Sequence, residues 1–517
     1  YYFNSRNSMT LFLMGSADYL TFDESDADIV DPESGDDPLM VGVQMKVDWQ
    51  SHSQGLYYTW RPNERISNRM MVYAALMEYY TYLNLPSNLA ASWLKDINVD
   101  SRPYIYGFKD RFRAEPLRDH IWVTAGFDYT LYHFTATGKT ILNNTSMGDD
   151  EFNIGDEDQF SVIELDERTV NHTLSGFVQT KFQVAGLTVH PGVHAEYFKR
   201  SGETVVDPRG MISYEFPSET TVSVAGGKYS SFIQTNPYLF NYMPQLSKVG
   251  GDYLKPETGY HRVVALEQKI GSYSIRGEGF YNTYRNVAES YYHYGPDGEV
   301  RLGMSEGRSK AHGVELMLKR DLREDEEGLF GWVNYTYTRS RYKSGLPNYA
   351  GIYGDSRNQI GDLYGDDWIN YYHEQRHNMK MVAGYTFRGG KFRGRHTISC
   401  KFQLYSSQPY TPIVGSNLDS NYVVATGKAR YVPVNGYPNS KYYATDHQLD
   451  IRYTYRTDYS WGYVSWYVEV INCYGQWHQV ANEQHWDYRY PYGEGNPEIR
   501  VPEGLMWIPN FGVEVKF

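Results

Sequence analysis

The last residues of the chain, Phe511–Phe517 (FGVEVKF), indicate the fold more directly than any other stretch. Successive side chains of an extended strand point to opposite faces, so this stretch has one apolar face and one polar face. The apolar face consists of Phe511, Val513, Val515 and Phe517. Soluble sheets can also end in such a strand, so the question is whether the pattern recurs.

The same two-faced pattern recurs along nearly the whole chain. Apolar residues hold alternate positions in many segments, among them Val314, Leu316 and Leu318, Leu449, Ile451 and Tyr453, Ile398, Cys400 and Phe402, and Met45, Val47 and Trp49. Charged residues lie between them, such as Glu315, Lys319, Arg452 and Lys46. We therefore expect Val314, Leu316, Leu318, Ile451 and Val515 to face lipid, and Glu315, Lys319, Arg452 and Glu514 to face a lumen.

The lengths of the strands and of their connections favour a transmembrane barrel. Many two-faced segments have about 12 residues or more, whereas ordinary strands have about 5 to 6. Six connections are short: Ala185–Gly186, Pro217–Glu219, Gly271–Ser272, Asp321–Gly328, Arg388–Gly394 and Thr457–Gly462. Six are long: Lys139–Thr169, Gln234–Glu257, Val287–Gly303, Tyr342–Gln375, Pro412–Thr445 and Gln476–Gly504. Short periplasmic turns and long extracellular loops are typical of an all-β, antiparallel outer-membrane barrel.

Composition excludes several other classes of protein. The net charge of -13 argues against nucleic acid as a partner, because phosphate binding needs a concentrated basic face. The two cysteines make no disulfide framework, and we expect Cys400 and Cys473 to be unpaired. No nucleophile elbow, P-loop or zinc spacing occurs, so the sequence predicts no enzyme, no cofactor and no metal site. His190, His194 and Glu196 share a strand face, which lumen-facing polar residues explain more simply than a metal does.

Several short motifs, in order, resemble those of TonB-dependent outer-membrane transporters. The run Asp207–Arg209, the residues Gly227 and Tyr229, and the element Leu254–Glu257 are similar to a mid-barrel signature of that family. Further similar residues are Gly313–Glu315, Gln375–His377, Pro409–Thr411 and the terminal Phe517. The order in which these motifs follow one another is what carries the resemblance.

The resemblance implies energised uptake of a scarce ligand of the iron-siderophore, cobalamin, oligosaccharide or peptide class. It implies a location in the outer membrane, contact with membrane lipid and lipopolysaccharide, and coupling to the TonB energising complex through a missing N-terminal region. We count roughly eighteen strands and expect 22 in the complete protein. Residues 1–517 are thus expected to be one transmembrane barrel domain, without the signal peptide, TonB box, plug and first strands. A passive porin and a barrel-anchored surface interaction or scaffold protein stay open as alternatives.

Two sets of residues are candidates for ligand binding. Rigid aromatic side chains in extracellular loops can bind sugars, aryl groups or protein at low entropic cost, or can pack the loops together. The loop candidates are Tyr353, Tyr364, Trp368, Tyr371, Tyr372, Trp477, Trp486 and Tyr488. The lumen candidates, charged residues on predicted inward faces, are Arg276, Glu278, Glu315 and Arg452.

Overall fold

The computed structural model describes most, but not all, of the 517 residues. The described ranges are 2–4, 6–23, 44–84, 97–143, 160–232, 255–294, 300–323, 326–343, 368–389, 394–418, 429–475, 490–493 and 507–516, with positions 420 and 423. Among the described residues, no helix is both long and apolar enough to cross a membrane.

Twenty-four strands make up the described structure, and eighteen of them have nine or more residues. The long strands are β2 (Asn7–Asp23), β3 (Gln44–Asn63), β4 (Ile66–Asn84), β5 (Ile97–Leu117), β6 (Ile121–Asn143), β7 (Phe160–Val184), β8 (Leu187–Phe198), β9 (Glu203–Glu215), β10 (Thr220–Ser231), β11 (Glu257–Ile270), β12 (Tyr273–Tyr294), β13 (Val300–Arg320), β14 (Gly328–Lys343), β16 (His377–Arg388), β17 (Arg395–Tyr405), β22 (Asp446–Tyr459), β23 (Gly462–Ile471) and β24 (Ile508–Lys516). The short strands are β1 (Tyr2–Asn4), β15 (Ile369–Asn370), β18 (Pro409–Tyr410), β19 (Ile413–Leu418), β20 (Tyr431–Asn435) and β21 (Lys441–Tyr442). The sequence predicted roughly eighteen strands, which agrees with the eighteen long strands, and the six short strands of the described structure come in addition.

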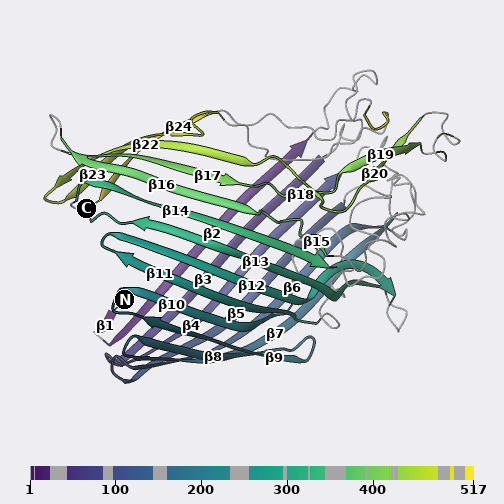
Figure 1. The fold of residues 1–517 in the computed structure, drawn as a ribbon. Helices are drawn as coiled ribbons and strands as arrows, with labels where there is room; N and C mark the ends of the chain where they lie inside the picture. Colours follow the sequence, from purple (N-terminus) through teal and green to yellow (C-terminus); the bar gives the residue numbers. More distant parts are fainter. Residues whose placement is uncertain are drawn as a thin grey trace.

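Each long strand pairs antiparallel with the next one in sequence, so a single 20-stranded sheet runs from β1 to β24. The sheet curves into the wall of a barrel whose strands are strongly tilted (Figure 1). β1 and the end of β24 lie on the side of the short turns, at the left of the figure. In the described ranges, no ladder joins β24 to β1 or β2. The small pairs β18–β21 and β19–β20 lie at the opposite, loop-side end.

The connections alternate between short and long as predicted. The shortest connections between long strands have two residues each, and they join Asn63 to Ile66, Val184 to Leu187, Ile270 to Tyr273 and Tyr459 to Gly462. Two predicted loops are shorter than expected, because β12 and β13 extend over most of 287–303, and β6 and β7 extend into 139–169. Continuous backbone pairing between two adjacent strands can extend beyond the membrane without an apolar face, which periodicity alone does not reveal.

The two faces of the sheet separate as predicted on β13 and β24. Val314, Leu316 and Leu318 are 45%, 54% and 45% exposed, and Glu315 lies on the opposite face between them. On β3, however, the apolar face changes sides: Trp49 pairs with Asp18 and Leu56 with Leu11 in one unbroken ladder, which places Trp49 and Leu56 on opposite faces. β3 has 20 residues, and only about 9 to 11 of them are needed to cross the hydrocarbon layer. The half of β3 that lies beyond the hydrocarbon therefore does not need an apolar outward face.

The two cysteines are unpaired, as predicted. Cys400 shares a face of β17 with the exposed Ile398, whereas Cys473 follows β23 at the loop-side end.

Candidate ligand-binding site

A buried carboxylate organises the loop-side rim between β15 and β16. Glu374 is 2% exposed. Its Oε2 accepts a 2.9 Å hydrogen bond from the backbone N–H of Ser340. Its Oε1 accepts bonds from Nε of Arg376 at 2.5 Å and from the hydroxyl of Tyr442 at 2.7 Å. A buried carboxylate is costly unless it is paired and hydrogen-bonded, so these contacts fix β14, the start of β16 and β21 to one another.

Arg376 and Tyr442, the two side chains that are hydrogen-bonded to Glu374, also contact each other. The guanidinium carbon of Arg376 lies 4.3 Å from the ring centroid of Tyr442, a cation–π contact. Burial and the hydrogen bond to Glu374 raise the pKa of the Tyr442 hydroxyl above its ordinary value, so this hydroxyl stays protonated and remains a donor.

Three rings directly precede Glu374 in the sequence, and we name Tyr371, Tyr372 and His373 the rim platform. The backbone N–H of Glu374 donates a 2.8 Å hydrogen bond to the carbonyl oxygen of Tyr371, which connects the platform to the buried acid. The ring centroids of Tyr371 and Tyr372 are 4.8 Å apart, and those of Tyr372 and His373 are 4.0 Å apart. Burial raises the pKa of Tyr371 to about 12. Tyr372 is 46% exposed, so the platform offers an aromatic surface to solvent.

Side-chain amides tie the platform to the neighbouring loop. Nδ2 of Asn370 donates to the carbonyl of Asn439, and Nδ2 of Asn439 donates to the carbonyl of Asn370, both at 2.9 Å. Asn439 has a φ of 51°, a left-handed conformation that Asn tolerates better than most residues. The rim above β14 to β22 is therefore held together by polar contacts between segments distant in sequence.

Trp368 makes a different contact. Nζ of Lys310 lies 4.0 Å from its ring centroid, and Trp368 lines a cavity of about 500 Å³ with Arg285 and Arg308.

The lumen candidates form two separate groups. Arg276 donates to Glu278 at 2.7 Å and lies 3.9 Å from Glu267, while Glu315 pairs with Glu278 across β12 and β13. Arg452 lies on β22, where its guanidinium carbon is 3.8 Å from the ring centroid of Tyr467. β14, β16 and β17 separate the two groups within the sheet.

Of the predicted loop aromatics, the structure brings Tyr371 and Tyr372 together. Tyr353, Tyr364, Trp477, Trp486 and Tyr488 lie outside the described residues. Sequence reasoning missed the roles of Glu374, His373 and Tyr442. The sequence did contain one indication of this site: Glu374 is a carboxylate directly before Gln375–His377, one of the motifs that resemble the family.

The run Asp207–Arg209 also has a physical explanation. Asp207 is 3% exposed and accepts hydrogen bonds from the backbone N–H of Ser230 at 2.8 Å and from its hydroxyl at 2.7 Å. Lys228 and His194 lie 3.5 and 3.9 Å from its carboxylate. This acid links β9 to β10 near the loop side. Within the described part of the chain, no group of three or more side chains is arranged to hold a metal.

Comparison with known proteins identifies the family. A family profile described as TonB dependent receptor-like, beta-barrel, matches residues 4–473. The chain belongs to this family. It is an integral β-barrel protein of the outer membrane, and the family implies contact with TonB and with outer-membrane lipids.

Solved structures of this kind share the fold. The outer membrane transporter YddB from Escherichia coli matches with a TM-score of 0.66 and 11% identity, over 100% of this chain and 67% of that one. The FrpB iron transporter from Neisseria meningitidis matches with a TM-score of 0.62 and 12% sequence identity, over 100% of this chain and 71% of that one. BauA, the ferric preacinetobactin receptor from Acinetobacter baumannii, matches with a TM-score of 0.60 and 11% sequence identity, over 99% of this chain and 70% of that one. No curated protein sequence matches the chain.

Proposed function

We propose that the chain forms the barrel of an energised transporter that takes up a scarce ligand of the iron-siderophore, cobalamin, oligosaccharide or peptide class. The observation that carries this proposal is the rim platform, an exposed aromatic surface fixed by the buried Glu374 at the loop-side end of a barrel with charged groups on its wall. A surface that only keeps loops soluble needs no such buried anchor.

In this proposal the ligand meets aromatic side chains first and charged ones later. Tyr371 and Tyr372 lie in the described rim, and we propose that the remaining predicted aromatics act beside them: Tyr353, Tyr364, Trp477, Trp486 and Tyr488. Trp368, which was predicted with them, contacts Lys310 on the outward face of the wall and is left out of this surface. Arg276, Glu278, Glu315 and Arg452 then receive the ligand's polar groups. Truncation of a buried aromatic contact costs about 1 to 3 kcal/mol of binding.

Energy coupling is proposed to come from TonB through a plug segment that is not among residues 1–517. The chain covers 67% to 71% of the length of the three solved transporters named above, which supports this proposal. We further propose that the chain has no catalytic activity, since its family consists of transporters rather than enzymes.

Uptake measurements in living cells test the proposal. Radiolabelled ferric siderophore, cobalamin, maltodextrin and peptide are offered to cells that express the full protein, with and without the inner-membrane energising complex. Accumulation of one probe only in energised cells is expected. Equal uptake by cells with and without the energising complex would favour the passive porin. Binding without uptake would favour the surface scaffold. Tyr372→Ala should weaken binding of that probe, and Tyr459→Ala, which removes an exposed Tyr at the short-turn end, should not.

A further inference from the structure

Strands β11 to β14 carry a dense set of basic side chains on the face that points away from the lumen. Their ladders run without irregularity from Tyr273↔Arg320 to Arg285↔Arg308 and on to β14, so residues two apart share a face. On β13, the face that carries Leu318, Leu316 and Val314 near the short turn therefore carries basic residues further toward the loop side. These residues, which we name the outer basic patch, are Arg262, Arg285, Arg308, Lys310, Arg339 and Arg341.

Members of the outer basic patch lie directly beside one another. Arg285 pairs with Arg308 across β12 and β13, and Lys310 pairs with Arg341 across β13 and β14. Like charges at directly opposed positions destabilise a sheet unless an anion offsets them. Glu306, two residues beyond Arg308 on β13, is an acidic neighbour. Among the described residues, no carboxylate forms an ion pair with Arg285, Arg308 or Arg341.

The height of the patch corresponds to the outer-leaflet head groups. Lys310 lies ten residues from Arg320, where β13 ends at its short turn. At about 3.3 Å per residue and a tilt of about 40°, ten residues rise roughly 25 Å, which is the height of the apolar band of such barrels. Arg285, Arg308, Lys310 and Arg341 thus lie at or beyond the height where the hydrocarbon ends, whereas Arg262 and Arg339 lie two residues nearer the short turns, at the upper edge of the apolar band.

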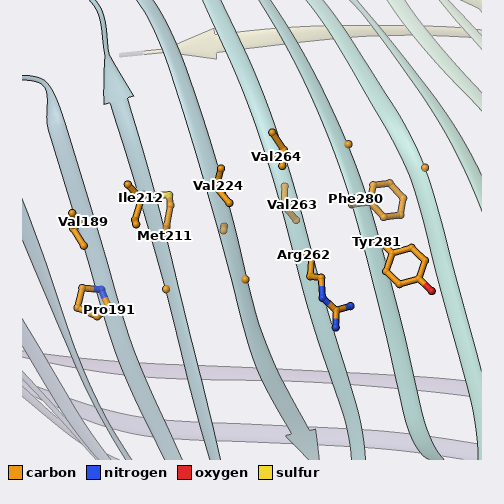
Figure 2. Close-up of a pocket in the computed structure, with 15 residues that line it drawn as sticks. Val189, Pro191, Met211, Ile212, Val224, Arg262, Val263, Val264, Phe280 and Tyr281 are labelled. Atoms are coloured by element: carbon orange, nitrogen blue, oxygen red, sulfur yellow. The ribbon is translucent and has the colours of Figure 1, made fainter.

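An apolar groove on the same wall adjoins the patch. It has a volume of about 900 Å³ and is lined by Ile212, Val224 and Val264, which are 57%, 54% and 56% exposed. Figure 2 shows these three side chains on the near side of the wall, with Met211 and Val263 behind it. The lining also includes Gly210, Gly226 and Gly279, whose missing side chains leave the wall hollow.

The groove and the patch are continuous through two shared residues. Arg262 and Tyr281 line both the groove and the cavity of about 500 Å³ that contains Arg285, Arg308 and Lys310. The guanidinium carbon of Arg262 lies 5.8 Å from the ring centroid of Tyr281. In the described structure, Nε of Arg339 and Nδ1 of His312, on the same face, are buried without a hydrogen-bond partner.

We propose that this surface binds a phosphorylated lipid of the outer leaflet, with an acyl chain in the groove and a phosphate at the outer basic patch. Guanidinium groups bind phosphate oxygens in bidentate fashion, and glycine-lined hollows let an acyl chain approach the backbone. The charge, the height and the apolar groove match the two ends of one amphipathic molecule. The inference rests on the outer-membrane location and is independent of which ligand is transported.

Lipid retention tests the charged half of the site. The full protein is extracted from outer membranes in mild detergent, washed, and its bound lipopolysaccharide is quantified by mass spectrometry. The double variant Arg285→Gln/Arg308→Gln should retain about tenfold less than the wild type, since each basic side chain near a membrane surface contributes to anionic-lipid affinity. Arg276→Gln/Arg452→Gln, which makes the same two changes on the lumen face, should retain the wild-type amount. Equal retention by the wild type and the folded double variant would overturn the proposal; heat-modified mobility on gels establishes that each variant is folded.

A second pair of variants tests the apolar half. A Cβ atom added at Gly279 meets no atom within 4 Å, so Gly279→Leu directs a side chain into the open space of the groove. Gly277→Leu adds the same side chain two residues along β12, where the nearest atom, Cδ2 of Leu316, is at 3.5 Å, and it is the control. Gly279→Leu should lose lipopolysaccharide and Gly277→Leu should keep it. If inorganic pyrophosphate displaced the lipid from the patch and Gly279→Leu had no effect, the site would be one for free phosphates, and the lipid proposal would fall.

Discussion

The hydroxyl of Tyr442 donates a 2.7 Å hydrogen bond to the carboxylate of Glu374, across 68 residues of sequence. This bond joins the segment before β16 to the two-stranded β18–β21 sheet, and Arg376 completes the group at 2.5 Å. Loops that lie beyond the apolar band lack a large core, so a few buried polar contacts decide whether they have one conformation.

Glu374→Ala should therefore loosen the rim while the barrel stays folded. Removing one partner of a buried pair leaves the other uncompensated and costs about 3 kcal/mol. We expect hydrogen exchange of residues 369–376 to accelerate by roughly a hundredfold, since about 1.4 kcal/mol corresponds to a factor of ten. Glu326→Ala is the control, because Glu326 makes an exposed ion pair with Arg323 at 3.8 Å near a short turn. Unchanged exchange in Glu374→Ala would remove the anchoring role from this residue.

Alkaline pH should weaken the same region. Burial raises the pKa of Tyr371 to about 12, whereas the unfolded side chain has an ordinary pKa of about 10. Between these values the unfolded state loses its proton first, so the stability contributed by Tyr371 is complete below pH 10 and is lost as the pH rises toward 12. Tyr371→Phe should reduce this dependence. Hydrogen exchange of residues 369–376, measured at several alkaline pH values for the wild type and for Tyr371→Phe, tests this prediction. An identical pH dependence in the two proteins would show that the Tyr371 hydroxyl does not cause the loss of stability.

Much of the fold follows from the sequence because its constraints are periodic. Lipid imposes apolar residues at alternate positions, as at Val314, Leu316 and Leu318, so strand number and faces could be predicted. Where lipid no longer acts, prediction fails: Trp49 and Leu56 occupy opposite faces of one strand, and β12 and β13 continue through a predicted loop.

The site was less accessible to such reasoning. Tyr371 and Tyr372 were identifiable as clustered aromatics, but their support is a contact between Glu374 and Tyr442 that no local pattern encodes. The outer basic patch was missed for a similar reason, since Arg285, Arg308 and Arg341 come together only once the register of three strands is known.

The two faces of β13 offer a direct test of that register. Val314→Arg places a charge toward lipid and should cost about 2 to 4 kcal/mol near mid-membrane, whereas Glu315→Gln in the lumen should change stability far less. Equilibrium unfolding by denaturant in lipid vesicles measures both. Equal losses for the two variants would show that the register is displaced by one residue.

The two-residue turn between β7 and β8 yields a final pair of opposite predictions. Ala185 and Gly186 have φ values of 48° and 82°, and both are left-handed. A left-handed conformation costs an L-residue with a Cβ about 1 to 2 kcal/mol, and Asn tolerates it better than Ala does, so Ala185→Asn should stabilise the barrel by roughly 0.5 to 1 kcal/mol. Gly186→Ala should destabilise it, because the added Cβ would also lie 2.5 Å from the backbone oxygen of Glu215. Denaturant unfolding in vesicles should therefore shift in opposite directions for the two neighbouring substitutions; a shift in the same direction would mean that backbone strain does not limit this turn.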